Sequence, residues 1–110
     1  MNVVATNDQY ATEMAHLHAR AAECRLRVVD SQLSLGFTLC AIAETEIIYA
    51  QYDEARKMVQ KVRRHLETIR IRIDAPNHLP TIAIADLRLQ VTQLEKRTEE
   101  IESRLRQRLT

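Results

Sequence analysis

Apolar residues recur every three or four positions along three long segments of the chain, which is the spacing of one face of an α-helix. In the first segment they run from residue 10 to residue 49 and comprise Tyr10, Met14, Leu17, Ala21, Cys24, Val28, Leu35, Ile42 and Tyr49. Small polar residues at positions 31, 38 and 45 weaken this stripe without changing its phase. We therefore expect either one long helix over residues 7–50 or two helices with a break near residues 34–36, where the only glycine lies.

The predicted start of this helix rests on a capping motif. Thr6 is followed three positions later by Gln9, a spacing that satisfies free amide groups at a helix N-terminus. The motif leaves residues 1–6 as a disordered N-terminus. Within the helix, residues 33–49 are apolar on nearly every side, which is typical of a helix surrounded by others. We therefore expect this segment to lie at the centre of the fold.

Two further helices are predicted. The first covers residues 53–74 and must end before Pro76, because a residue that precedes proline is forced out of the helical conformation. Its apolar face comprises Ala55, Val59, Val62, Leu66, Ile69 and Ile73. The second covers residues 80–109 and carries a heptad typical of a coiled coil, namely Ile84, Leu87, Val91, Leu94, Thr98, Ile101 and Leu105. The second half of this last helix is charged outside the heptad, so we expect it to project or to pair with another chain.

The run Tyr52-Asp53-Glu54-Ala55, where the helix predicted over residues 53–74 begins, resembles the start of the second helix of a tetratricopeptide repeat. Small residues of that family let two antiparallel helices approach closely, and Ala43 and Ala55 match those positions. The apolar positions of the repeat are matched by Leu39, Ile42, Val59 and Val62. The resemblance covers residues 39–62 and implies a helical hairpin over residues 36–74, with the peptide-binding role that the family often has.

Composition supports the same fold class. The chain has one Gly, two Pro and 45% hydrophobic residues, and the predicted fold is a single all-α domain, an elongated antiparallel bundle of three or four helices over residues 1–110. Sixteen basic and fifteen acidic residues nearly cancel, so no overall field attracts nucleic acid or an anionic membrane. No run of eighteen apolar residues occurs and the first eight residues lack a basic region, so we expect neither a membrane-spanning helix nor a signal peptide.

The cysteines and histidines give no sign of catalysis. If Cys24 and Cys40 lie on one helix, they are too far apart to form a disulfide. We interpret both as buried structural thiols of a reducing compartment, the cytoplasm. Glu13 and His16 form one Glu-x-x-His pair, whereas helical di-metal sites need two such pairs and further glutamates. The sequence also lacks a glycine-rich phosphate loop and a serine-centred elbow. We therefore expect no catalytic, metal or cofactor site, and no enzyme, although a helical enzyme whose site the sequence does not reveal stays open.

These patterns favour a non-catalytic protein that binds other proteins or assembles with itself as a helical scaffold. Three helices with apolar stripes expose more apolar surface than a thin monomer can cover, so we expect a homodimer. The predicted contacts are Met14, Leu17, Leu94, Ile101 and Leu105. The alternative is a small nucleic-acid-binding or regulatory protein that uses the basic helix over residues 56–72, with Lys57, Lys61, Arg63 and Arg64 as contacts for phosphate.

Overall fold

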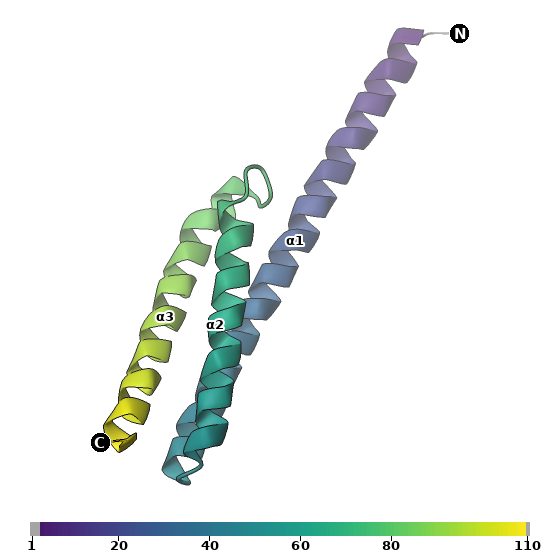
Figure 1. Cartoon of the computed structure of the whole chain (residues 1–110). Coiled ribbons are helices and arrows are strands. Elements are labelled where there is room, and N and C mark those ends of the chain that lie inside the picture. Colours follow the sequence, from purple (N-terminus) through teal and green to yellow (C-terminus); the bar gives the residue numbers. More distant parts are fainter. Residues whose placement is uncertain (1–2, 110) are drawn as a thin grey trace.

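The protein is a bundle of three helices, α1 (Val3–Ile48), α2 (Tyr52–Asp74) and α3 (Thr81–Leu109). The computed structural model describes the backbone of residues 3–109 and the side chains of residues 7–108, and this part of the chain contains no strand (Figure 1). The predicted all-α bundle is therefore confirmed, with three helices. The molecule is a rod with principal extents of 78 × 19 × 15 Å.

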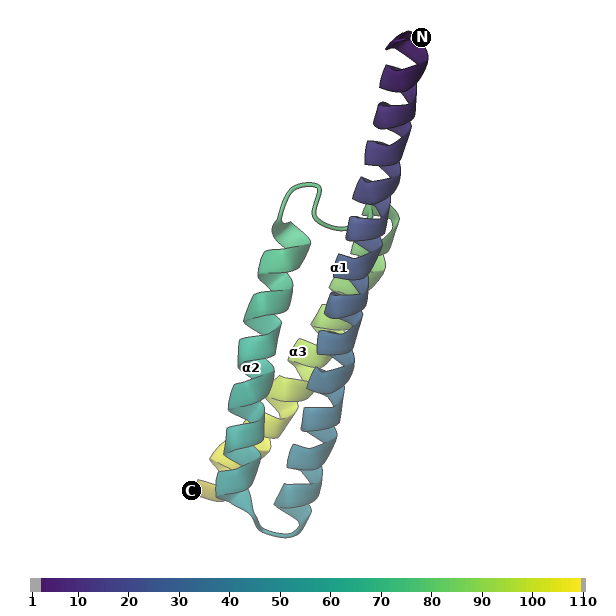
Figure 2. The ribbon, with the colours of Figure 1, turned by 90° about the vertical axis from the view of Figure 1, so that its right-hand side faces the viewer.

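The three helices differ in length, and this difference shapes the molecule. At 1.5 Å per residue, α1 is about 69 Å long and α2 about 34 Å. α2 turns back along the C-terminal half of α1, and α3 runs beside both, antiparallel to α2 (Figures 1 and 2). The N-terminal half of α1 therefore extends beyond the bundle with no other helix beside it.

α1 is a single helix, which decides between the two predicted alternatives. It begins at Val3 and not near residue 7, so residues 3–6 belong to the helix and not to a disordered terminus; Met1 and Asn2 lie outside the described residues. The helix continues without a break through Gly36. A lone glycine costs only about 1 kcal/mol in a helix interior, which neighbouring turns readily offset.

Gly36 of α1 lies directly against Leu94 of α3. A Cβ atom at this position would lie 2.6 Å from Cδ2 of Leu94, a separation that side chains do not tolerate. Leu94 is fully buried, so its side chain has little room to withdraw. The glycine therefore permits this close contact between the two helices.

The core runs along the axis where the three helices meet. All six predicted apolar residues of α2 are buried, and so are all the members of the α3 heptad except Ile84, which is partly buried. α1 contributes a different face from the predicted one. Its buried residues are Val29, Leu33, Gly36, Leu39, Cys40 and Ala43.

Two short connections reverse the chain. At the end of α1, the amide of Ala50 donates to the carbonyl oxygen of Ile47 at 3.0 Å, and that of Gln51 donates to Glu46 at 2.7 Å. This is the Schellman arrangement, and Ala50 occupies its left-handed position with φ of 59°. The connection between α2 and α3 is held against α1 by Arg25, whose Nε donates to the carbonyl oxygen of His78.

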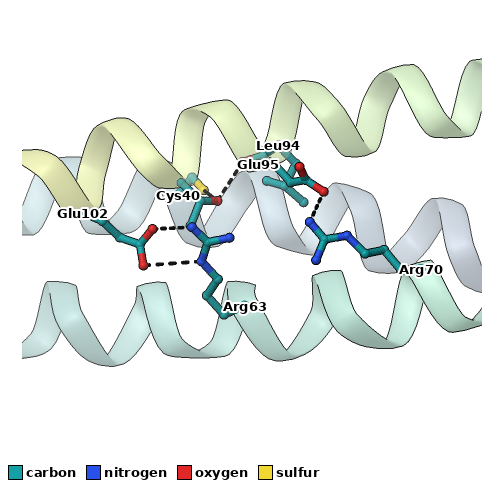
Figure 3. A network of polar contacts seen from close by, with 7 residues as sticks. Cys40, Arg63, Arg70, Leu94, Glu95 and Glu102 are labelled. Atoms are coloured by element: carbon teal, nitrogen blue, oxygen red, sulfur yellow. Dashed lines mark hydrogen bonds and ion pairs between the residues drawn. The ribbon is translucent and has the colours of Figure 1, made fainter.

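Ion pairs between the helices line the edges of the core. Arg63 donates to Glu102, and Arg70 to Glu95, which joins α2 to α3 (Figure 3). A further pair joins Arg97 of α3 to Glu44 of α1. Partly exposed pairs contribute about 1 kcal/mol or less each, so they help to set the register of the helices more than the stability of the fold.

α1 also meets the length and composition expected of a membrane-crossing helix. The segment that passes this test spans Asn7–Ile48, and a third of its most apolar stretch is buried inside the bundle. The core helix of a soluble protein passes the same test, so the expectation that the chain does not cross a membrane stays a prediction.

Candidate functional site

The most distinctive surface of the molecule is the apolar stripe that the sequence analysis identified on α1. Most of its large members are solvent-exposed, with 56% of Leu17, 44% of Leu35 and 40% of Ile42 accessible, whereas Met14 is partly buried. The buried residues of α1 lie on another face of the helix, directed at α2 and α3. Residues 33–49 were expected at the centre of the fold, but only one of their two apolar faces is covered. The exposed face continues toward the N-terminus of α1. We call this whole row the outer stripe, defined by Tyr10, Met14, Leu17, Ala21, Cys24, Val28, Ser31, Leu35, Thr38, Ile42 and Thr45 of α1 and by Tyr49 directly after the helix.

The two threonines of the outer stripe are less polar than their side chains suggest. The hydroxyl of Thr38 donates to the carbonyl oxygen of Ser34 at 3.0 Å, and that of Thr45 donates to Ala41 at the same distance. Each hydroxyl is therefore satisfied within the helix. Moreover, the chain has no charged residue between Asp30 and Glu44. This part of α1 offers a partner an uncharged surface.

Two shallow hollows lie on the outer stripe. One is lined by Arg27, Val28, Ser31, Gln32 and Leu35, and the other by Thr38, Ala41, Ile42, Thr45 and Glu46. Each contains four residues at positions i, i+3, i+4 and i+7. In coiled coils, four residues of one helix form the hole that receives a side chain of the partner helix. The outer stripe thus has the surface shape expected of a helix that packs against another helix.

The predicted contact residues divide between this surface and the core. Met14 and Leu17 lie on the outer stripe, in the half of α1 that extends beyond the bundle. Leu94, Ile101 and Leu105 are at most 5% exposed, because the connection at residues 75–80 returns α3 onto α1 and α2. These three residues pack within their own chain. The half of a helix that projects is the N-terminal half of α1, and not the C-terminal half of α3 as expected.

The basic helix does not present its cations as one strip. Lys57 pairs with Glu54 at 3.1 Å, and Arg63 turns toward α3, where it binds Glu102. The hydrogen bond to Glu102 raises the pKa of the Arg63 guanidinium above its ordinary value, despite partial burial. Lys61 and Arg64 are exposed. Of the four predicted phosphate contacts, two are thus engaged by carboxylates, which weakens the case for a nucleic-acid surface on α2.

The two cysteines occupy opposite environments. Cys24 is exposed on the outer stripe, so the expectation that both thiols are buried is wrong for this residue. Cys40 is fully buried, with its Sγ 3.7 Å from Oγ1 of Thr98. Thr98 donates its own hydroxyl proton to the carbonyl oxygen of Leu94 at 2.7 Å, so the thiol is the donor toward Thr98. Burial raises the pKa of the Cys40 thiol, and the resulting neutral thiol is unsuited to nucleophilic attack.

Alkaline pH should reveal the buried state of Cys40. Its thiol ionises at a higher pH in the folded protein than in the unfolded chain, where the ordinary pKa is 9.0. This residue therefore leaves the free energy of unfolding unchanged below pH 9 and lowers it above, by at most about 1.4 kcal/mol at pH 10. Urea unfolding at pH 7.5 and pH 10 should show an extra loss in the wild type relative to Cys40→Ala. Equal losses in both proteins would show that the thiol titrates normally.

Neither metal binding nor a known relative offers another site. Among the residues whose side chains are described, no three His, Cys, Asp or Glu residues gather in a way that would hold a metal ion. No protein-family model, curated protein or solved structure matches the chain. In the hairpin of α1 and α2, Ala43 and Ala55 are fully buried, whereas Ile42 is 40% exposed. The resemblance to a tetratricopeptide repeat therefore rests on its residues alone.

Proposed function

We propose that this protein is a non-catalytic helical scaffold that associates with itself, and that the outer stripe of α1 is its contact surface. The observation that carries the proposal is the exposure of this stripe. It keeps an alternating spacing of four and three over twelve positions from Tyr10 to Tyr49, which is the pattern of a coiled-coil contact. A stripe needed only for the bundle would end where α2 and α3 end, but this one continues along the projecting half.

The size of the surface is adequate for a dimer. The stripe extends over about 58 Å of helix and, at a width of roughly 10–12 Å, offers some 600–700 Å² per chain. Standard specific interfaces bury roughly 800 Å² per partner. Covering a half-exposed Leu or Ile contributes roughly 1 kcal/mol. The seven large apolar residues of each stripe together provide about 14 kcal/mol per dimer, against a cost of association of roughly 4–15 kcal/mol. The net of about 6 kcal/mol that a dimer needs at tens of micromolar lies within this range, so we expect a reversible dimer.

A thiol on the outer stripe also indicates the cellular compartment. Cys24 is a free and exposed thiol at a contact position of the stripe. Such a thiol persists in a reducing environment and is oxidised in a secretory one. We therefore propose that the protein works in the cytoplasm.

Solution mass by light scattering tests the proposal. The wild type should have twice the monomer mass of 12.7 kDa at tens of micromolar, and Leu35→Glu with Ile42→Glu should give a monomer, because each new carboxylate would be buried in the contact. Ile71→Glu with Leu89→Glu is the matched control, since both residues are exposed apolar residues outside the stripe. A monomeric wild type, or an unaltered dimer in the stripe variant, would refute the proposal.

A further inference from the structure

We infer that the occupant of the outer stripe is a second copy of α1 in antiparallel orientation, so that each projecting half lies along the bundle of the other copy. This inference rests on the proposed self-association and adds the direction and register of the pairing. α1 has 46 residues and α2 has 23, so the part of α1 that α2 leaves uncovered is about as long as the part that α2 covers. An antiparallel pair therefore covers both halves in both copies.

In the antiparallel orientation, the stripe has one register in which all twelve positions find a partner. In antiparallel coiled coils, the two kinds of contact position face each other across the helices. Pairing Tyr10 of one copy with Tyr49 of the other brings every further position of the stripe into such a layer. The remaining layers are Met14 with Thr45, Leu17 with Ile42, Ala21 with Thr38, Cys24 with Leu35, and Val28 with Ser31.

Side-chain volume favours this orientation. Three of the six layers pair a large residue with a small one, as where Met14 faces Thr45. A parallel pair in register would instead face each position with itself. It would stack Ser31, Thr38 and Thr45 against their own copies, which leaves gaps between wider layers. Interiors are close-packed, and unfilled volume lowers the stability of a contact.

Charge beside the stripe favours the same orientation. In a parallel pair, Arg20 would lie opposite Arg25 of the other copy, twice by symmetry, and like charges at such flanking positions repel. In the antiparallel register, Arg20 lies opposite Ala41 and Arg27 opposite Ser34. Neither arginine then faces a like charge.

The hollows fit this register as well. The one lined by Thr38, Ala41, Ile42 and Thr45 lies opposite Leu17 of the second copy. The other lies near the twofold axis, opposite Val28 of the second copy. Both hollows thus receive an aliphatic side chain, as in knobs-into-holes packing. α1 becomes the central helix of the assembly, with α2 and α3 on one face and the partner helix on the other.

Disulfide trapping tests the orientation in the full-length chain. In a Cys40→Ala background, Leu35→Cys places a second thiol opposite Cys24 of the other copy. Mild oxidation should convert most of this variant into a covalent dimer, and peptide mapping should find the bond between residues 24 and 35. The bond cannot form within one chain, because eleven residues of helix separate the two thiols by about 16 Å.

Two controls separate the outcomes. The Cys40→Ala protein alone should stay uncrosslinked, whereas a Cys24–Cys24 dimer would show a parallel pair and overturn the inference. Ile42→Cys in the same background should also stay uncrosslinked, since a bond to Cys24 there would show a register shifted by one heptad. A light-scattering dimer in which Leu35→Cys does not crosslink overturns the inference and leaves self-association standing. A wild type that is monomeric by light scattering would refute both the self-association and the antiparallel pairing.

Discussion

Gly36→Val should lower the free energy of unfolding by about 2 kcal/mol, because its side chain enters space that Leu94 fills. Leu94→Ala should cost about 2–5 kcal/mol, since it removes a fully buried side chain. Both substitutions act on the same space between α1 and α3. The loss in free energy of unfolding in the double variant should therefore be smaller than the sum of the two single losses, by about 1 kcal/mol or more. The methyl groups of the new valine then occupy the cavity that alanine leaves.

Chemical unfolding of the four proteins measures this coupling. Thr68→Val is the control, because it introduces the same side chain at an exposed position of α2 and should change stability by about 0.5 kcal/mol or less. Additive losses in the double variant would show that Gly36 and Leu94 do not share a contact. A harmless Gly36→Val would show that α1 and α3 are farther apart than the structure places them.

The sequence was most informative for α2. One apolar face at helical spacing, an acidic first turn and the proline after the helix left a single interpretation, and all six predicted residues are buried. The helix begins at Tyr52 and ends at Asp74, within one residue of the prediction. A helix with one stripe and clear end signals has only one way to bury that stripe.

α1 was harder to interpret because it carries two apolar faces. The longer stripe dominates the pattern, and the structure leaves it exposed. The face that is buried starts with the partly buried Leu26 and continues through Val29, Leu33, Gly36, Cys40 and Ala43. In the sequence, the small residues of this face merge into a segment that is apolar on nearly every side. Before Leu26 this face holds only small residues such as Ala19 and Ala22, so the point at which the bundle begins is visible in the sequence.

α3 shows the limit of periodicity. Its heptad marks Leu94, Ile101 and Leu105 as one apolar face, and we expected this face to contact a second chain, whereas the structure buries it within the bundle. A heptad does not say whether a contact lies within one chain or between two. The answer depends on the connection at residues 75–80, which includes Asn77 with φ of 55° and returns α3 to the bundle. The apolar stripe of α3 is thus buried within its own chain, and the outer stripe of α1 stays exposed for a partner.

The projecting half of α1 should be helical only while a partner covers it. No other helix supports residues 7–24, and isolated helices of this length are marginal in water. In the variant Leu35→Glu with Ile42→Glu, which breaks the dimer, the amides of residues 7–24 should therefore lose their protection and exchange within seconds. The same change should remove roughly a fifth of the helical circular dichroism signal, the share of the helical residues that lie before the bundle.

Residues of the core provide the internal reference for this experiment. Amides near Leu66 and Leu94 should stay protected in the variant, because the three-helix core contains neither substituted side chain. The control variant Ile71→Glu with Leu89→Glu should keep protection in both regions. Slow exchange at residues 7–24 in a monomer would mean that this half of α1 is stable alone. The helix over these residues would then be no evidence for a partner, and the solution mass and the trapped disulfide would be the tests of the outer stripe as a contact surface.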